Sequence, residues 1–390
     1  MRLHEFQAKR LLGDYGLPTP RGFVALTPDE AEAVARDLNA ARIAVKAQIH
    51  SGERLQAGGV RIVHGPAMAR SAAADMIGQR LVTAQTSEDG EAVRRVYVEE
   101  GVAADRSLHL ALLVDPSKGG LVVMGSPDGG TGVEERARSG NLHQESLSLP
   151  IKGAIDREAL AAFLAGLGLK DGEIEAGAAV VEGLRRAFVE LDATLIEINP
   201  LAVTATGELK ALDVKMTLDD NALFRHPELA SLRDEDDAAR TKLSAHRDQL
   251  NFVQLDGDIG LVSNGAGLGL ATLDMVVAAG GRPANFMDVR TTARSLDIAH
   301  GFALLLDNPK IRTLLINVHG GGMQSCDTIA EGLGVALRRS GRKLPIVIRL
   351  AGQNAEFARS RLKNFGCAVI EAADMGEAAA RAVAVAAGRG

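Results

Sequence analysis

The sequence has little of what marks a secreted, membrane or nucleic-acid-binding protein. Its only cysteines, Cys326 and Cys367, are far apart and form no CxxC pair, which argues against a zinc site and against a disulfide scaffold. No apolar run reaches the length of a membrane span, and no signal peptide follows Met1. The net charge is −6 and there is no basic stripe, so nothing indicates binding to nucleic acid. We therefore expect a cytoplasmic protein.

Glycine, in contrast, is abundant and occupies 43 of the 390 positions. Many of these glycines lie where an expected strand meets an expected helix. Such junctions suit phosphate binding, because glycine lets backbone amides approach an anion closely. The same abundance also suits any tightly turned α/β protein, so composition alone does not define the ligand.

A chain of 390 residues is too long for one typical domain, and three stretches differ in character. Residues 1–217 mix expected hairpins with helices, which indicates an α+β domain. Residues 218–256 are charged and rich in turns, which favours a solvated linker. Residues 257–390 alternate apolar strands with amphipathic helices, which predicts an α/β domain with a parallel sheet covered on both faces.

The segment 195–216 predicts two strands around a TATGE turn. Side chains alternate between faces along a strand, so Glu197 shares a face with Asn199, and Asp213 shares a face with Lys215. If the two strands pair antiparallel, these polar groups meet on an otherwise apolar ribbon. Their carboxylate and amide oxygens suit the Mg²⁺ that a nucleotide carries. The alternative is a half-exposed hairpin whose polar face merely meets water.

A lysine within an apolar strand marks a second candidate site. Lys46 lies in the strand expected at 43–50, and a buried lysine needs an anionic partner, such as a phosphate. The loop that follows contains Arg54 and the pair Gly58-Gly59, and it could fold over phosphates. The alternative is a surface hairpin whose lysine extends into water.

Two glycine turns in the last third of the chain predict further anion sites. The stretches 264–267 (NGAG) and 320–322 (GGG) each follow a strand and precede a helix. Neighbouring strand ends could hold one phosphate or carboxylate between these turns. Asp288 ends the intervening strand, like the ribose-binding acid of dinucleotide folds, so an NAD-dependent enzyme is a competing hypothesis. Leu270, however, occupies the last glycine position of that fingerprint.

Taken together, these segments resemble the β subunits of succinyl-CoA synthetase and of its relative, malate–CoA ligase. The resemblance covers nearly the whole chain and rests on MRLHEFQAKRLLGDYGLPTPRG, VKAQIH, QRLVTAQT, LIEINPLAVT, DVKMTLDDNALFR, NGAGLGLATLDMV, GGRPANFMDV and CDTIAEG. It implies an ATP-grasp fold in the N-terminal half and a flavodoxin-like CoA-ligase domain with a parallel sheet in the C-terminal half. It also implies an ADP-forming acid–CoA ligase that activates a small dicarboxylic acid.

The resemblance further implies cofactors and a partner. The cofactors are Mg²⁺ and ATP, with GTP as the alternative nucleotide, and CoA binds through an α subunit that carries a phosphorylated histidine. ATP phosphorylates that histidine, the phosphate passes to the dicarboxylic acid, and the CoA thiol attacks the resulting acyl phosphate. This is phosphoryl transfer, which depends mainly on positioning and on charge neutralisation.

Carried over position by position, the resemblance implies a role for each candidate. The residues implied to contact the nucleotide are Lys46, Arg54, Glu99 and Val102. The magnesium ligands implied are Asn199 and Asp213. The residue implied to orient the phosphohistidine is Glu197. The residues implied to bind the acid or its acyl phosphate are Asn264, Gly321, Gly322 and Met323, and to these we add Arg290.

The chain also departs from the family pattern. Glu53 and Leu55 occupy glycine positions in the loop that should approach phosphates, and Ser107 stands where the family has an acidic residue. The family's glycines after Asp288 are replaced by the segment 290–292 (RTT). One hypothesis is an acid other than succinate, whose extra hydroxyl or anionic group binds this segment. The others are a non-catalytic or regulatory partner subunit, and neutral drift of the loops.

Overall fold

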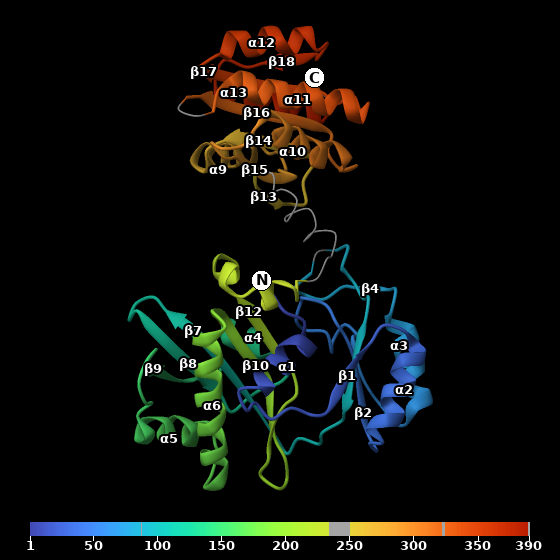
Figure 1. Ribbon diagram of the computed structural model, residues 1–390, viewed down its shortest axis with the longest axis vertical. Helices are drawn as coiled ribbons and strands as arrows, with labels where there is room; N and C mark the ends of the chain where they lie inside the picture. Colours follow the sequence, from blue (N-terminus) through green and yellow to red (C-terminus); the bar gives the residue numbers. More distant parts are fainter. Residues whose placement is uncertain (87, 234–249, 322–323, 389–390) are drawn as a thin grey trace. The chain divides into compact units, whose positions relative to one another are not determined.

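The computed structural model describes residues 1–86, 88–233, 250–321 and 324–388 (Figure 1). The first strand along the chain belongs to a small antiparallel sheet. The strands, in their spatial order, are β1 (Gly22–Ala25), β6 (Val96–Glu100), β2 (Ile43–Ala47) and β3 (Val60–Val63). Helices α2 (Pro28–Leu38) and α3 (Pro66–Met76) pack on it, and their alanines share a core with the valines of β2 and β6. All five residues of β2 are buried, so Lys46 must find its partners inside the protein.

A larger antiparallel sheet contains the hairpin expected at 195–216. Its strands are, in spatial order, β11 (Leu209–Ala211), β10 (Ala193–Val203), β7 (Arg106–Asp115), β8 (Gly120–Ser126) and β9 (Glu145–Leu149), and β12 (Val214–Leu218) also pairs with β10. The sequence predicted two strands around the turn and left their antiparallel pairing open. In the structure the second expected strand is divided in two, and β10 pairs antiparallel with both β11 and β12, with Glu197 opposite Lys215. The register of β10 shifts between Ile198 and Leu201, around the cis peptide bond that joins Asn199 to Pro200.

Three helices accompany the larger sheet, namely α1 (Glu5–Gly13), α5 (Arg157–Gly166) and α6 (Gly172–Glu190). The apolar face of α6 contributes Val180, Leu184 and Phe188 to one core with the apolar residues of β7 and β10. Helix α1 reaches the same core through Ala8 and Leu12. The remaining short elements are β4 (Arg80–Leu81), β5 (Glu91–Ala92), α4 (Val133–Arg138), η1 (Asp220–Arg225) and α7 (Pro227–Ala230).

The last part of the chain forms a second compact unit, Asp234–Gly390, after a first unit, Met1–Arg233. The strands of its single sheet are, in spatial order, β13 (Leu250–Gln254), β15 (Asn285–Val289), β14 (Ile259–Asn264), β16 (Thr313–Gly320), β17 (Ile346–Gly352) and β18 (Val369–Glu371). The helices are α9 (Ala266–Ala278), α10 (Ser295–Asp307), α11 (Cys326–Ser340), α12 (Ala355–Asn364) and α13 (Met375–Ala386).

Helices cover both faces of this sheet, as the sequence predicted. Leu314 and Ile316 belong to one core with α10, α11 and α12, whereas Leu315 belongs to another with α9 and α13. This alternation is the period of two that a strand imposes. All neighbouring strands from β15 to β18 pair parallel.

The stretch 218–256, which the sequence predicted as a linker, has secondary structure at both of its described ends. Its first part contains η1 and α7. Its last part contains β13, which pairs antiparallel with β15 at the edge of the sheet. Leu250 is buried there and Phe252 packs against the same core. Burial of this short apolar run therefore stabilises a strand within a stretch that is otherwise polar. Residues 234–249, which include the DEDD run, lie outside the described residues.

Within the described part of the chain, no helix combines the length and the apolar character needed to cross a bilayer.

The contact between α6 and the end of α1 predicts a strong effect for one substitution. A Cβ atom on Gly183 would lie 2.2 Å from the backbone oxygen of Tyr15, an atom that cannot rotate away. We expect Gly183→Ala to lower the free energy of unfolding by about 1–3 kcal/mol. Urea titration followed by circular dichroism measures this loss.

Gly172→Ala, at the start of the same helix, is the matched control. A Cβ atom there meets no atom within 4 Å, so alanine should be neutral or stabilising by up to about 1 kcal/mol. Equal stabilities for the two variants would contradict the close packing of α6 on the chain after α1.

Candidate active site

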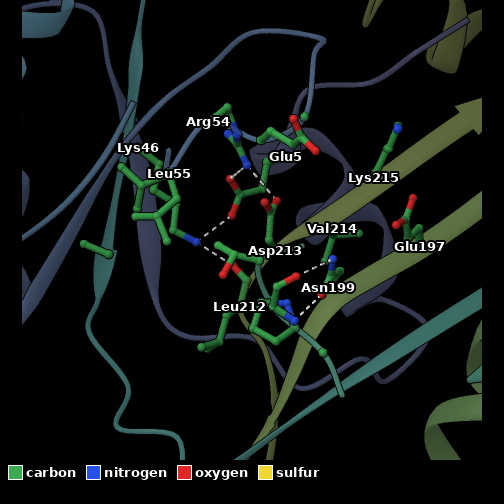
Figure 2. Close-up of a pocket in the computed structure, with 18 of the residues that line it drawn as sticks. Glu5, Lys46, Arg54, Leu55, Glu197, Asn199, Leu212, Asp213, Val214 and Lys215 are labelled. Atoms are coloured by element: carbon green, nitrogen blue, oxygen red, sulfur yellow. Dashed lines mark hydrogen bonds and ion pairs between the residues drawn. The ribbon is translucent and has the colours of Figure 1, made fainter. Parts of the chain in front are cut away.

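A cleft of about 500 Å³ opens in the first unit (Figure 2). Strands of both sheets and the loop at residues 48–59 form its walls. Lys46, Glu99, Asn199 and Asp213, which lie far apart in the sequence, all line it. Small-molecule sites measure roughly 300–1,000 Å³, so the cleft has room for a ligand.

Lys46 is buried in the wall of this cleft, with a side chain only 7% exposed. Its Nζ atom lies 2.9 Å from Oε1 of Glu5, forms an ion pair with Glu99 and donates to the backbone oxygen of Leu212. Burial alone would lower the pKa of Lys46, but Glu5 and Glu99 raise it above its ordinary value. The lysine is therefore charged, and the alternative of an exposed hairpin lysine is wrong.

Arg54 connects the loop at residues 48–59 to both sides of the cleft. Its Nη2 atom lies 2.7 Å from Oε2 of Glu5 and 2.7 Å from Oδ1 of Asp213. Its Nη1 atom donates to the backbone oxygen of Ala47 over 2.9 Å. Figure 2 shows Arg54 and Lys46 directed at the same carboxylate, that of Glu5. The two cations suited to phosphate thus share one anionic partner within the protein.

Glu5 and Lys9 complete the network, and the sequence analysis missed both. Lys9 Nζ lies 2.9 Å from Oε1 of Glu5 and 2.6 Å from Oε2 of Glu99. Burial opposes ionisation of Glu5, yet Lys46, Lys9 and Arg54 hold its pKa well below the ordinary value. A signal existed in the sequence, because a spacing of four residues places Glu5 and Lys9 on one face of α1, beside the buried Ala8.

The structure brings Asn199 and Asp213 together at the point where β10 and β12 meet. The backbone nitrogen of Asn199 donates to the backbone oxygen of Asp213 over 3.0 Å. Oδ1 of Asn199 accepts a hydrogen bond of 2.6 Å from the nitrogen of Gly130, and Nδ2 donates to the oxygen of the same glycine. Asp213 is 41% exposed towards the cleft. The side-chain amide of Asn199 is thus fixed in orientation at the wall of the cleft.

The side-chain oxygens of Asn199 and Asp213 are suitable ligands for a magnesium ion that is bound to phosphates. The described residues contain no group of three or more His, Cys, Asp or Glu that could hold a metal on their own. Mg²⁺ commonly takes one or two protein oxygens and completes its shell with phosphates and water. Asn199 and Asp213 therefore suit a nucleotide-bound ion better than a permanent structural one.

Glu197 lines the same cleft and contacts a histidine that the sequence did not pair with it. Nε2 of His109 lies 3.2 Å from Oε1 of Glu197, and Lys215 is the cross-strand neighbour. The hydrogen bond from His109 is the main factor that lowers the pKa of Glu197, and Lys215 adds to it, against the effect of burial. Glu197 is therefore ionised at neutral pH.

The two family departures in the loop after β2 line the cleft without filling it. Glu53 has a φ of 58°, in the left-handed region where a side chain is strained and glycine is favoured. No hydrogen bond or ion pair joins its carboxylate to another described residue. Leu55 is half exposed at the cleft wall. Val102, assigned to the nucleotide by the resemblance, also lines the cleft.

Three candidate residues of the second unit are described, and Asn264, Arg290 and Gly321 all lie at the carboxyl ends of its strands. The side chain of Asn264 bridges from β14 to β16, because it donates to the oxygen of His319 and accepts from its nitrogen. Gly321 follows β16 and pairs through its backbone with Gln324. Gly322 and Met323 lie outside the described residues. Arg290 follows β15 and donates to Oδ1 of Asn251 over 2.8 Å.

Asp288 does not present the carboxylate that an NAD-binding domain needs. Its side chain is buried, Oδ1 accepts from the nitrogen of Gly265 over 2.6 Å, and Oδ2 accepts from Nδ2 of Asn251 over 2.8 Å. Both oxygens are therefore engaged within the sheet edge and at the start of α9. The geometry argues against the hypothesis of a ribose-binding acid at this position.

Comparison with known proteins agrees with this arrangement. Residues 2–203 match the family model of the ATP-grasp domain, and residues 262–383 match that of the CoA-ligase. The fold is similar to that of ATP citrate lyase from Methanothrix soehngenii in complex with citrate and coenzyme A, with a TM-score of 0.73, 19% identity and coverage of 99% of both chains. An ATP-grasp domain followed by a CoA-ligase domain defines the class of ADP-forming acid–CoA ligases.

Full-length relatives narrow this class. The chain is 43% identical over 385 residues to the succinate–CoA ligase [ADP-forming] subunit beta of Anaeromyxobacter dehalogenans, covering 98% of each sequence. It is 39% identical over 390 residues to the protein of the same name from Burkholderia cenocepacia, covering 100% of each. The chain therefore belongs to the family of succinate–CoA ligase β subunits.

The central place of Glu5 predicts a large loss of stability on neutralisation. In Glu5→Gln, Lys9, Lys46 and Arg54 lose a shared buried carboxylate. We expect a loss of about 3 kcal/mol in the free energy of unfolding at pH 7, measured by urea titration. The control is Glu32→Gln, which removes surface ion pairs with the exposed residues Arg36 and Arg70 and should change stability by no more than about 0.5 kcal/mol.

The pH dependence of the free energy of unfolding should also differ between the wild type and Glu5→Gln. The pKa of Glu5 in the folded protein lies well below the ordinary value of 4.5. Its stabilising contribution is therefore complete above about pH 4.5 and is lost as the pH falls through the folded pKa. Glu5→Gln lacks this acid-dependent loss, so its stability should fall less steeply than that of the wild type. Parallel curves would contradict the ionised Glu5.

Proposed function

We propose that this chain is the nucleotide-binding β subunit of an ADP-forming acid–CoA ligase that activates a small dicarboxylic acid. The observation that carries the proposal is the cleft of the first unit. There, the buried cations Lys46 and Arg54 lie beside the oxygen donors Asn199 and Asp213. Phosphates bind to cations such as Lys46 and Arg54, and the metal ion that accompanies the phosphates binds to oxygen ligands such as those of Asn199 and Asp213. Membership of the succinate–CoA ligase family supports the same conclusion.

In this proposal, Lys46 and Arg54 hold the phosphates of ATP, or of GTP, with Glu99 and Val102 at the cleft wall. Asn199 and Asp213 hold Mg²⁺, which supplies charge neutralisation to the phosphates when it is bound. Holding the phosphates and the acceptor in line is the main task, because phosphoryl transfer requires little covalent chemistry from the protein.

Glu197 is proposed to orient a histidine of a partner α subunit. Its carboxylate is ionised and lies in the same cleft, so it can accept the N–H of an incoming imidazole. The other imidazole nitrogen then attacks the γ-phosphorus, the bond from this phosphorus to the β–γ bridging oxygen breaks, and ADP leaves. His109 and Lys215 keep the Glu197 carboxylate charged while this happens.

The second unit is proposed to bind the dicarboxylic acid or its acyl phosphate at the carboxyl ends of its strands. Asn264, Gly321, Gly322 and Met323 are the positions assigned by the family resemblance. Arg290 follows the neighbouring strand β15, where a guanidinium suits an additional anionic or hydroxyl group. We therefore propose a substrate related to succinate or malate, with CoA bound through the α subunit.

The proposal predicts transfer of the γ-phosphate to a histidine. The chain purified with its α partner should acquire an acid-labile, base-stable label on the α subunit from γ-³²P-ATP. CoA together with the correct acid should remove this label. Succinate, malate, itaconate, sulfonated acids and larger hydroxy acids, tested in parallel, should identify the acid.

Lys46→Met should reduce the rate of labelling by at least about a hundredfold, because a charged donor to the phosphates is lost. Lys118→Met removes an exposed lysine outside the cleft and should label at the wild-type rate. Binding of Mg·ATP without any labelled histidine would refute the ligase function. Absence of Mg·ATP binding in calorimetry would favour the non-catalytic partner subunit instead.

A further inference from the structure

Arg54 is held by two carboxylates that differ sharply in their surroundings. Glu5 is almost completely buried, whereas Asp213 is 41% exposed and faces the cleft. Both accept from the same Nη2 atom of Arg54, at 2.7 Å each. No described residue makes a hydrogen bond with Oδ2 of Asp213. One partner of Arg54 is therefore fixed within the protein, and the other is open to a ligand.

The ion network around these residues is balanced in charge without any ligand. Three cations, Lys9, Lys46 and Arg54, face three carboxylates, Glu5, Glu99 and Asp213. Adding a phosphate alone would place an anion beside Asp213. Adding a metal ion alone would draw Asp213 away and leave Arg54 with Glu5 as its one carboxylate. The first change places two anions side by side, and the second leaves Lys9, Lys46 and Arg54 with two carboxylates in place of three, so each change is unfavourable.

We propose that the Arg54–Asp213 ion pair is exchanged when nucleotide and metal bind together. Mg²⁺ takes the Asp213 carboxylate, and a phosphate oxygen takes its place on Nη2 of Arg54. Glu5 and the backbone oxygen of Ala47 keep the guanidinium in position, so Arg54 exchanges one partner and does not swing freely. This inference rests on the proposed nucleotide site and specifies how that site becomes available.

The exchange makes the two ligands cooperative. In their absence, Arg54 and Asp213 each block the group that the other ligand needs. Whichever ligand binds first breaks the pair and lowers the cost for the second, and this coupling must be equal in both directions. Lys46 has no comparable role, because its carboxylate partners, Glu5 and Glu99, are both deeply buried.

Asp213→Asn tests the exchange, because two measurements should change in opposite directions. In EDTA, ADP should bind the variant at least about fivefold more tightly than the wild type, since Arg54 is released and the opposing carboxylate is gone. In excess Mg²⁺, ADP should bind the variant at least about fivefold more weakly, since a metal ligand is lost. Isothermal titration calorimetry of the chain with its α partner measures both.

Asp75→Asn is the matched control, since it breaks an aspartate–arginine pair, with Arg61, that lies outside the cleft. Its ADP affinities should equal those of the wild type in both buffers. Weaker or unchanged ADP binding by Asp213→Asn in EDTA would overturn the exchange, because Asp213 would then bind the metal without releasing Arg54. A wild type that binds no ADP in excess Mg²⁺ would instead refute the proposed nucleotide site itself.

Arg54→Gln tests the other half of the pair and serves if Asp213→Asn does not fold. Without the guanidinium, Asp213 is open to a metal before any nucleotide arrives. Mn²⁺ alone, followed by the electron paramagnetic resonance signal of the free ion, should bind this variant at least about fivefold more tightly than the wild type. Equal affinities would overturn the exchange.

Discussion

The first unit depends on one constraint, which is that three buried cations must meet three carboxylates. An unpaired charge in such a place would cost several kcal/mol, so the elements that carry these groups have to arrive together. The groups come from α1, from β2 and β6 of the small sheet, from the loop after β2 and from the residue that precedes β12 of the larger sheet. The ion network therefore ties the two sheets to each other across the cleft.

The strongest patterns in the sequence predicted local structure well. The segment 195–216 predicted two strands around a turn, and the structure confirms strands on both sides of that turn, although the second one is divided into β11 and β12. The rhythm of the last third predicted a sheet with helices on both faces, which the two cores confirm. Both patterns are local periodicities of apolar and polar residues, so they can be recognised in a short segment of sequence.

What the sequence did not reveal are partners that are distant along the chain. Lys46 was expected to need an anion, but the anions it finds in the protein are Glu5 and Glu99, on two other elements. His109 was not expected to contact Glu197, 88 positions away. Strand β13 was assigned to a linker, because its apolar residues are few and gain their burial from the neighbouring core. Such contacts depend on the whole fold and produce no periodic pattern in the local sequence.

The charge and exposure of Glu53, the residue with the strained backbone, affect how the binding of an anion in the cleft depends on ionic strength. Lys46 and Arg54 are buried, so dissolved ions screen their attraction for a polyphosphate only weakly. Glu53 is partly exposed at the cleft wall, so dissolved ions screen its repulsion more effectively. Salt thus removes more of the repulsion than of the attraction. In the nucleotide site proposed above, a glutamate where the family pattern has glycine should therefore make nucleotide affinity unusually tolerant of salt.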